Sequence, residues 1–200
     1  MVVDSHVHVF CREVLPEANR WSFARWAATR RLPVRDPADI YPRVGTRTWD
    51  PEGEDLLEWM DFCGIDSVVN LVTDWGLTWG EEPEWDIWKV NQFAADLRQK
   101  FPVGRYHFAC GVDPRRYNAS EVVEKAVKEW GAVALKLLPC TGFYPNDAVC
   151  YPLYETVQNL GIPIVMHTGH GDVAPYPMQS HPFNVADVAR DFPKLNIILA

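Results

Sequence analysis

The sequence has no hydrophobic run long enough to cross a membrane. Spanning a bilayer takes about 20 consecutive apolar residues, and no stretch of this chain approaches that length. The amino terminus also lacks the basic and then apolar pattern of a secretory signal peptide. We therefore expect no membrane partner and a cytoplasmic location.

Clusters of basic residues are absent as well. The chain has 19 Lys and Arg against 27 Asp and Glu, which gives a formal net charge of -8. This balance argues against a nucleic-acid-binding surface. The five cysteines never occur as Cys-x-x-Cys, a pattern that fits a reduced compartment better than a disulfide framework or a thiolate metal site.

No Gly-x-Gly-x-x-Gly motif follows any apolar run, so the main signal of a dinucleotide-binding fold is missing. Instead, short apolar runs rich in β-branched residues alternate with amphipathic segments. This alternation predicts strands and helices in turn, as in a parallel sheet built from βαβ units. We predict strands at the start of the chain and over residues 67–72, 106–112, 133–138, 164–167 and 195–199, and helices over residues 21–31, 52–62, 85–101, 120–130 (with Ser120 as N-cap), 151–160 and 185–192.

The predicted strands are almost continuously apolar, which indicates that both faces of the sheet are covered. We therefore expect an α/β fold, specifically a (β/α)8 TIM barrel. Eight βα units take about 250 residues, so residues 1–200 are expected to form a single barrel domain truncated at the sixth strand. Residues 11–50, rich in Arg and Pro and without a clean period, are expected to be an insertion or lid within it.

Histidines mark the ends of two predicted strands. His6 and His8 alternate along the first strand and should share one face with Asp4, and His167 ends an apolar run just before Gly169. The carboxyl ends of parallel strands meet at one mouth of a barrel, where its chemistry is located. Three neutral imidazoles at that point would suit a divalent metal, with Zn²⁺ favoured and Mn²⁺ or Fe²⁺ as alternatives.

Four stretches, residues 4–8, 132–139, 142–147 and 161–169, resemble the amidohydrolase superfamily. Within it they are similar to the amidohydrolase-related branch of metal-dependent hydrolases and decarboxylases. The resemblance implies that His6, His8 and His167 are metal ligands. It also implies that a histidine after strand six and an aspartate at strand eight usually complete the centre, and that the strand-four lysine, here Lys136, is carboxylated and bridges two metals in some relatives.

Two residues are catalytic candidates. Lys136 shares a strand face with Ala134 and Leu138. If that face is the barrel interior, its amine is either free to contact substrate or carboxylated, because a buried lysine readily changes its pKa. A third interpretation is a lysine that extends from the strand end into solvent. His170 follows His167 in the same loop and could hold substrate, with a solvated loop histidine as the alternative.

Three further residues are candidates for substrate binding. Arg115 follows the third predicted strand and could pair with a substrate carboxylate, although Asp113 and Pro114 also fit a simple turn. Trp75 belongs to a tryptophan-rich segment that fits either core packing or an apolar wall over a pocket. Tyr144 lies in the loop after the fourth predicted strand.

These residues favour metal-assisted hydrolysis, in which a divalent ion activates water and polarises an amide, ester or lactone carbonyl. The substrate would be a small molecule, aromatic or carboxylated. The first alternative is non-oxidative decarboxylation of an aromatic or unsaturated acid with the same metal, which the tryptophan-rich segment favours. The second is a non-catalytic barrel whose histidines pack or bind a structural metal. A homo-oligomer is left open.

Overall fold

The computed structural model describes residues 1–45, 49–170 and 173–200. Its centre is one six-stranded sheet in which all neighbouring strands are parallel and the strand order follows the sequence. All six predicted strands are confirmed, with small shifts at their ends. They are β1 (Val3–Val7), β2 (Ser67–Leu71), β3 (Tyr106–Gly111), β4 (Ala134–Leu137), β5 (Ile164–Met166) and β6 (Ile197–Leu199).

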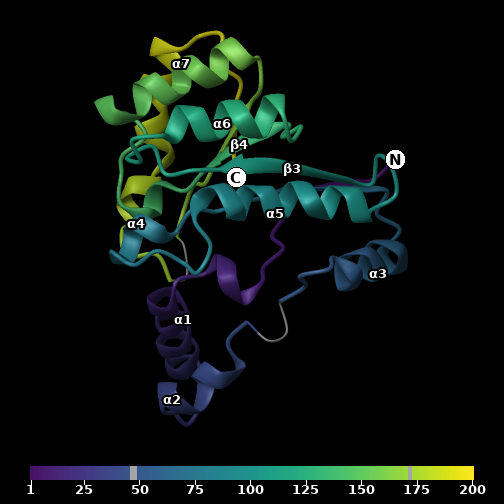
Figure 1. Ribbon diagram of the computed structural model, residues 1–200. Coiled ribbons are helices and arrows are strands. Elements are labelled where there is room, and N and C mark those ends of the chain that lie inside the picture. Colours follow the sequence, from purple (N-terminus) through teal and green to yellow (C-terminus); the bar gives the residue numbers. More distant parts are fainter. Residues whose placement is uncertain (46–48, 171–172) are drawn as a thin grey trace.

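Helices connect consecutive strands and the sheet curls into a half-barrel (Figure 1). Within the described residues, no helix combines the length and hydrophobicity that crossing a bilayer requires. The connecting helices are α3 (Glu54–Cys63), α4 (Gly76–Trp79), α5 (Ile87–Lys100), α6 (Ala119–Lys128), α7 (Tyr151–Leu160) and α8 (Ala186–Asp191), and short 3-10 helices in the later loops are η3 (Pro139–Thr141), η4 (Ala148–Cys150), η5 (Pro177–Ser180) and η6 (Pro182–Val185).

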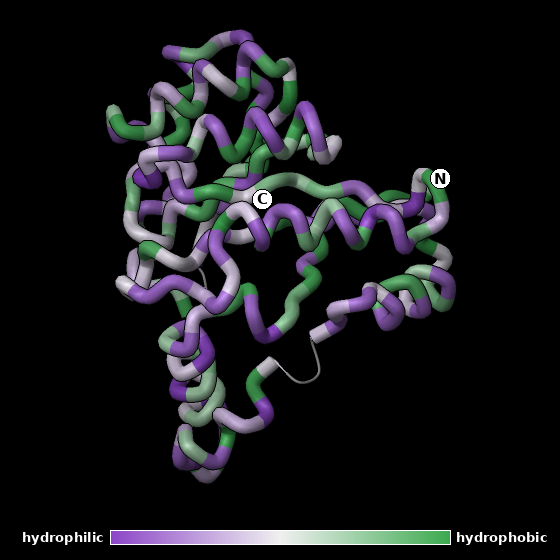
Figure 2. Tube along the Cα trace, viewed as in Figure 1, coloured by the Kyte–Doolittle hydropathy of each residue, from purple (hydrophilic) through white to green (hydrophobic). Residues whose placement is uncertain are grey.

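Side chains alternate across the sheet and form two apolar layers. The outer layer packs the strands against the helices, and hydrophobic residues alternate with hydrophilic ones along the helices (Figure 2). The inner layer is much smaller and consists of Leu71, Ala109, Ala134 and Val165. Because two of these four residues are alanines, the concave side of the sheet keeps room for larger polar side chains.

Helices α6 and α7 show where local signals succeed and fail. α7 ends at Leu160, as predicted, because Gly161 adopts the left-handed conformation with φ 71°. α6 begins at Ala119 with Asn118 in the cap position, so the prediction of Ser120 as N-cap is wrong. The hydroxyl of Ser120 instead accepts a hydrogen bond from Thr156 of α7 at 3.0 Å.

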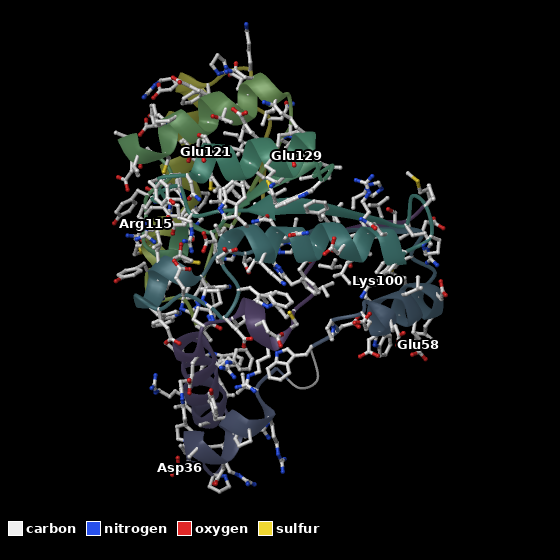
Figure 3. All side chains as sticks on the ribbon, in the orientation of Figure 1. Asp36, Glu58, Lys100, Arg115, Glu121 and Glu129 are labelled. Atoms are coloured by element: carbon white, nitrogen blue, oxygen red, sulfur yellow. The ribbon has the colours of Figure 1, made fainter. Side chains whose placement is uncertain are left out.

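The predicted insertion is mostly helical rather than irregular. Residues 12–43, which we call the arm, stand away from the sheet (Figure 1), and Asp36 marks the far end (Figure 3). Residues 46–48 of the predicted insertion lie outside the described residues. The arm contains η1 (Arg12–Val14), α1 (Glu17–Thr29), α2 (Pro37–Ile40) and η2 (Tyr41–Arg43).

The base of the arm is fixed to the loop between β2 and α5. The carboxylate of Glu81 accepts hydrogen bonds from the backbone N–H groups of Glu17 and Ala18 at 3.0 and 3.2 Å. These are unpaired donors of the first turn of α1, so the contact caps the helix and places a negative charge at its positive end. Trp21 stacks on Tyr41 with ring centres 4.0 Å apart, which holds α1 against the second half of the arm.

Gly111→Ala is expected to destabilise the protein by about 3 kcal/mol. A Cβ at Gly111 would lie 2.1 Å from the carbonyl oxygen of Val72, a backbone atom that cannot rotate away. Asn91 further fixes this glycine by two hydrogen bonds of 2.9 Å to its N–H and C=O. Urea unfolding measures the loss. The control is Gly104→Ala, which meets no atom within 4 Å and changes only a residue with φ +82°, at a cost of roughly 1 kcal/mol. Equal losses would contradict the steric argument.

Candidate active site

An irregularity in β1 sets the direction of its histidines. Asp4 pairs with Val68, but Val7 pairs with Asn70, so β1 uses one residue more than β2 over the same stretch. Such an extra residue breaks the strict alternation of a strand. Asp4 therefore lies beside a residue of the outer layer, whereas the two histidines line the inner cavity. The prediction that Asp4 shares their face is wrong.

The structure brings five of the sequence candidates together, four polar residues and Trp75. His6, His8, His167 and Lys136 line one cavity of about 1190 Å³. His8 follows β1 and His167 follows β5, so the cavity lies at the carboxyl end of the sheet, where parallel barrels keep their chemistry.

The imidazole of His8 is oriented by the backbone. Its Nδ1 lies 2.8 Å from the carbonyl oxygen of Leu71. A carbonyl only accepts, so Nδ1 carries the proton and Nε2 keeps its lone pair. Desolvation lowers the pKa of His8 to about 4. The hydrogen bond to Leu71 acts to raise this pKa, and the charge of Lys136 acts to lower it further. The ring is neutral at pH 7 and offers one nitrogen to a metal.

His167 follows directly on β5 and extends the sheet pairing, because its N–H donates to the carbonyl of Leu137 at 2.9 Å. Its Nε2 is buried and has no hydrogen-bond partner among the described residues. Desolvation lowers the pKa of His167 to about 4, and the charges of Lys136 and His6 act in the same direction. A buried nitrogen without a partner is unfavourable, and a bound ion or ligand atom would satisfy it.

His6 and His8 have a spacing that suits a shared metal ion. Their ring centres lie 5.2 Å apart in an edge arrangement. Two imidazoles on a tetrahedral zinc ion have ring centres about 5 Å apart, given a Zn–N bond of about 2.1 Å. Desolvation, and then the charge of Lys136, lower the pKa of His6 as well.

The coordination shell is not complete within the described part of the chain. There, no three His, Cys, Asp or Glu side chains form a group compact enough to hold a metal ion. The fit to a divalent ion rests instead on the chemistry of the three imidazoles and on the spacing of His6 and His8, and His167 lines the same cavity from the end of β5.

Lys136 lies on the inner face of β4, next to Gly111 and Val165 in the sheet register. Its side chain is 2% exposed, so the interpretation of a lysine that extends into solvent is wrong. The amine Nζ is buried and has no hydrogen-bond partner among the described residues. Desolvation lowers the pKa of Lys136 to about 8, so the neutral and charged forms are both accessible near physiological pH.

Aromatic and small residues form the wall around these groups. Trp75 lines the cavity and is held by a hydrogen bond from its Nε1 to Thr73 Oγ1 at 3.1 Å. Phe10 stacks on His8 at 5.6 Å and was missed in the sequence, although it lies two residues beyond His8 on the same strand period. Cys140 also lines the cavity, and desolvation raises the pKa of its thiol, which stays protonated.

Comparison with known proteins agrees with this geometry. The family model described as Amidohydrolase, of the amidohydrolase-2 family, matches residues 3–200. The chain belongs to the amidohydrolase-2 family. No curated protein sequence matches it.

Solved structures share the fold of this amidohydrolase-2 chain. A 4-oxalomesaconate hydratase from Rhodopseudomonas palustris is 22% identical, with a TM-score of 0.60 over 100% of this chain and 62% of that chain. A TIM-barrel protein from Bordetella bronchiseptica is 19% identical, with a TM-score of 0.64 over 98% and 65%. A 2,6-dihydroxybenzoate decarboxylase from Rhizobium is 17% identical, with a TM-score of 0.66 over 99% and 65%.

These likenesses show the TIM-barrel fold, which confirms the predicted fold class. This chain spans between 62% and 65% of the length of the three structures. Within this span the chain forms six parallel strands, and the family model matches residues 3–200.

The setting of Arg115 agrees with the turn interpretation, because its N–H donates to Oδ1 of Asp113 at 2.9 Å. Arg115 is not among the described residues that line the cavity and lies at the edge of the molecule near α4 (Figure 3). Its guanidinium binds both carboxylate oxygens of Asp113 at 2.9 and 2.6 Å and donates to the carbonyls of Gly142 and Thr141 at 3.1 and 3.2 Å. Arg115 therefore ties the loop after β4 to the loop after β3.

The two other loop candidates also lie away from the cavity wall. Neither Tyr144 nor His170 is among the described residues that line it. The side chain of Tyr144 is 42% exposed, and His170 is exposed next to residues 171–172, which lie outside the described residues. Of the three predicted substrate-binding residues, the structure places Trp75 at the cavity.

Asp74→Ala is expected to destabilise the protein by about 4 kcal/mol. The buried carboxylate of Asp74 accepts hydrogen bonds from Arg116 at 2.6 and 2.8 Å and from the N–H of Asp113 at 2.8 Å. Its removal leaves a largely buried guanidinium without its main counter-charge. Thermal and urea unfolding measure the effect.

The matched control is Glu82→Ala, which removes the other carboxylate bound to Arg116. Glu82 is half exposed, with 50% of its side chain accessible, so its loss should cost less than about 1 kcal/mol. Similar losses in the two variants would show that burial of Asp74 is not what makes its ion pair important.

Proposed function

We propose that this chain carries the metal-binding part of a metal-dependent hydrolase for a small carboxylated or aromatic substrate. The observation that supports it most directly is that imidazoles from the first and fifth strands share one cavity with the amine of Lys136. In the described part of the chain, Nε2 of His167 and Nζ of Lys136 have no partner. Buried polar groups without partners are rare, and here two of them face the same space.

His6, His8 and His167 are the residues that would hold the ion, with Zn²⁺ favoured over Mn²⁺ or Fe²⁺. Metal ligation requires neutral imidazole, and the pKa of each of these rings is lowered. When bound, the ion supplies a Lewis acid for activating water and polarising a carbonyl.

Lys136 would act on the substrate directly. With a pKa of about 8, its amine is mostly charged at pH 7 and can pair with a substrate carboxylate. The same pKa lies close enough to the working pH for the amine to donate or accept a proton. A carboxylated Lys136 is the alternative, because the lowered pKa increases the fraction of Lys136 that is neutral and can react with carbon dioxide.

The cavity wall favours a planar, carboxylated molecule. Trp75 and Phe10 offer aromatic faces, and Lys136 offers an amine that has no partner among the described residues. The names of two of the solved structures, a hydratase of oxalomesaconate and a decarboxylase of dihydroxybenzoate, both denote carboxylated compounds. They support this substrate class for the present chain.

The second candidate function is non-oxidative decarboxylation of an aromatic or unsaturated acid. The buried amine of Lys136 favours it, because carbon must take up a proton when carbon dioxide leaves and this amine is a proton donor at the cavity. The same three histidines would hold the metal.

A substrate panel tests these functions on the full-length protein. Aryl esters, lactones, amides and hydroxybenzoates are incubated with zinc-loaded protein, and products are followed by mass spectrometry together with carbon dioxide release. Hydrolytic turnover that stops with chelator and returns with zinc is expected. Carbon dioxide release alone would select decarboxylation. No turnover, with only a lower melting temperature after metal removal, would select the non-catalytic barrel.

A further inference from the structure

One side of the arm forms a long wall of the same cavity. Asn19, Phe23, Ala27 and Arg31 all line it. Their spacing of four residues places them along one face of α1 and its immediate continuation. With a rise of about 1.5 Å per residue, this stripe extends over about 18 Å, so the cavity offers contacts well away from the histidines.

The far part of this wall is positively charged. Arg31, Arg35 and Arg43 line it, and Asp39 is the acidic residue there among the described lining residues. The arm as a whole has seven arginines and four acidic residues in a chain whose net charge is -8. A local excess of positive charge in an acidic protein attracts anions to this wall.

Two of these arginines have no counter-charge among the described residues. In the described part of the chain, no hydrogen bond or ion pair involves the guanidinium of Arg31 or Arg35. By contrast, Arg115 and Arg116 each bind carboxylates near the sheet. The arm therefore presents guanidinium groups to the cavity with their donors available to a ligand.

Asn19 gives a second, independent sign of a ligand at this wall. It is 5% exposed and lines the cavity, yet its Nδ2 has no partner in the described residues. An amide donor buried without a partner is unfavourable. Between Asn19 and the arginines lies Phe23, which is 39% exposed and presents an apolar surface to the cavity.

We propose that the arm binds a second carboxylate of the substrate, so that the enzyme selects elongated dicarboxylates with an apolar middle. Arg31 and Arg35 would hold the remote carboxylate, Phe23 would contact the apolar part, and Asn19 would donate to a polar group nearer the histidines. This inference rests on the proposed function, since the first carboxylate belongs at Lys136 and the histidines. Guanidinium groups favour carboxylate because both its oxygens can be bound at once.

Binding of matched acids to the zinc-loaded, full-length protein tests the proposal. Isothermal titration calorimetry compares decanedioate with decanoate, which has the same length and one carboxylate less. We expect the dicarboxylate to bind about tenfold more tightly, as for one charge-assisted contact. Arg31→Gln/Arg35→Gln should remove this difference and leave decanoate binding unchanged.

Arg25→Gln/Arg30→Gln is the matched control, because it removes the same charge from the arm at residues that do not line the cavity. It should retain the tenfold difference. Equal binding of the two acids, or a difference that survives in Arg31→Gln/Arg35→Gln, overturns the proposal. An ω-phosphonate of the same length that binds more tightly than decanedioate would overturn the assignment to a carboxylate.

The proposed function can fail separately from this inference. A dicarboxylate preference that depends on Arg31 and Arg35, in a protein that turns over no substrate on the panel, supports the arm site and refutes the hydrolase. Hydrolytic turnover in a protein that shows no dicarboxylate preference supports the hydrolase and refutes the arm site.

Discussion

Lys136→Met is expected to reduce turnover by at least about 100-fold and to raise the stability of the metal-free protein by about 2 kcal/mol. Lys136 is 2% exposed and its amine has no partner in the described residues. The free-energy cost of removing the charged amine from water is therefore not offset by a hydrogen bond or an ion pair there. Methionine fills nearly the same volume without a charge. Steady-state kinetics and urea unfolding measure the two effects, and their opposite signs separate a functional residue from a structural one.

The gain in stability should depend on pH in a defined direction. Burial lowers the pKa of Lys136 from 10.5 to about 8, so between these values the unfolded chain binds more protons than the folded one. Wild-type stability contributed by this residue therefore rises with pH across that window. The advantage of the methionine variant is largest below pH 8 and disappears towards pH 10.5.

A surface substitution provides the control for Lys136. Lys128→Met removes a lysine from the exposed face of α6, where the amine pairs with Glu124, and should change stability by less than about 0.5 kcal/mol. A loss of stability in Lys136→Met would contradict the prediction. It would show that the amine has a partner in the folded metal-free protein.

His167→Ala is expected to weaken binding of divalent metal by at least about 100-fold and to remove turnover with it. His167 brings its Nε2 into the cavity from β5, opposite the pair on β1, and removing it leaves two imidazoles where a stable zinc site needs three or more ligands. Elemental analysis after dialysis against zinc measures the metal directly. Chelator should lower the melting temperature of the wild type and not of the variant, because only the wild type gains stability from the bound ion.

His8→Ala should reproduce the loss, since His8 lines the same cavity from the carboxyl end of β1. The control is His107→Ala. His107 lies on β3, pairs with Val69 towards the start of the strands and does not line the cavity. This variant should keep its zinc. Retention of zinc by His167→Ala and His8→Ala together would refute the metal site.

Local signals in the sequence were sufficient for the strands and for the longer helices α3, α5, α6, α7 and α8, but they did not predict the short helix α4. α7 matches its prediction from Tyr151 to Leu160, because an apolar helical period and a terminating glycine are both encoded locally. The placement of His8 and His167 at one end of the sheet also follows from local rules, since parallel strands put their carboxyl ends on one edge.

Contacts between segments far apart in the chain decided the rest. Arg115 contacts Asp113 within the local turn, but its bonds to the carbonyls of Thr141 and Gly142 join it to the next loop, and no local pattern predicts those. The arm lacks a clean hydrophobic period because α1 has polar residues on several sides, and the helix predicted over residues 21–31 spans Glu17–Thr29. Glu81 and the stacking of Trp21 on Tyr41 stabilise it. The arginines of the arm face the cavity only through this docking.

The sequence by itself determined the order of strands, the fold class and which residue types stand at the strand ends, because these depend on hydrophobic period and chain direction. The tertiary structure alone decided that Asp4 leaves the face of His6, through one extra residue in β1, and that Lys136 is buried with no partner in the described part of the chain. Both depend on the packing of neighbouring strands, where the cost of an unpaired amine is set by surroundings that no single segment encodes.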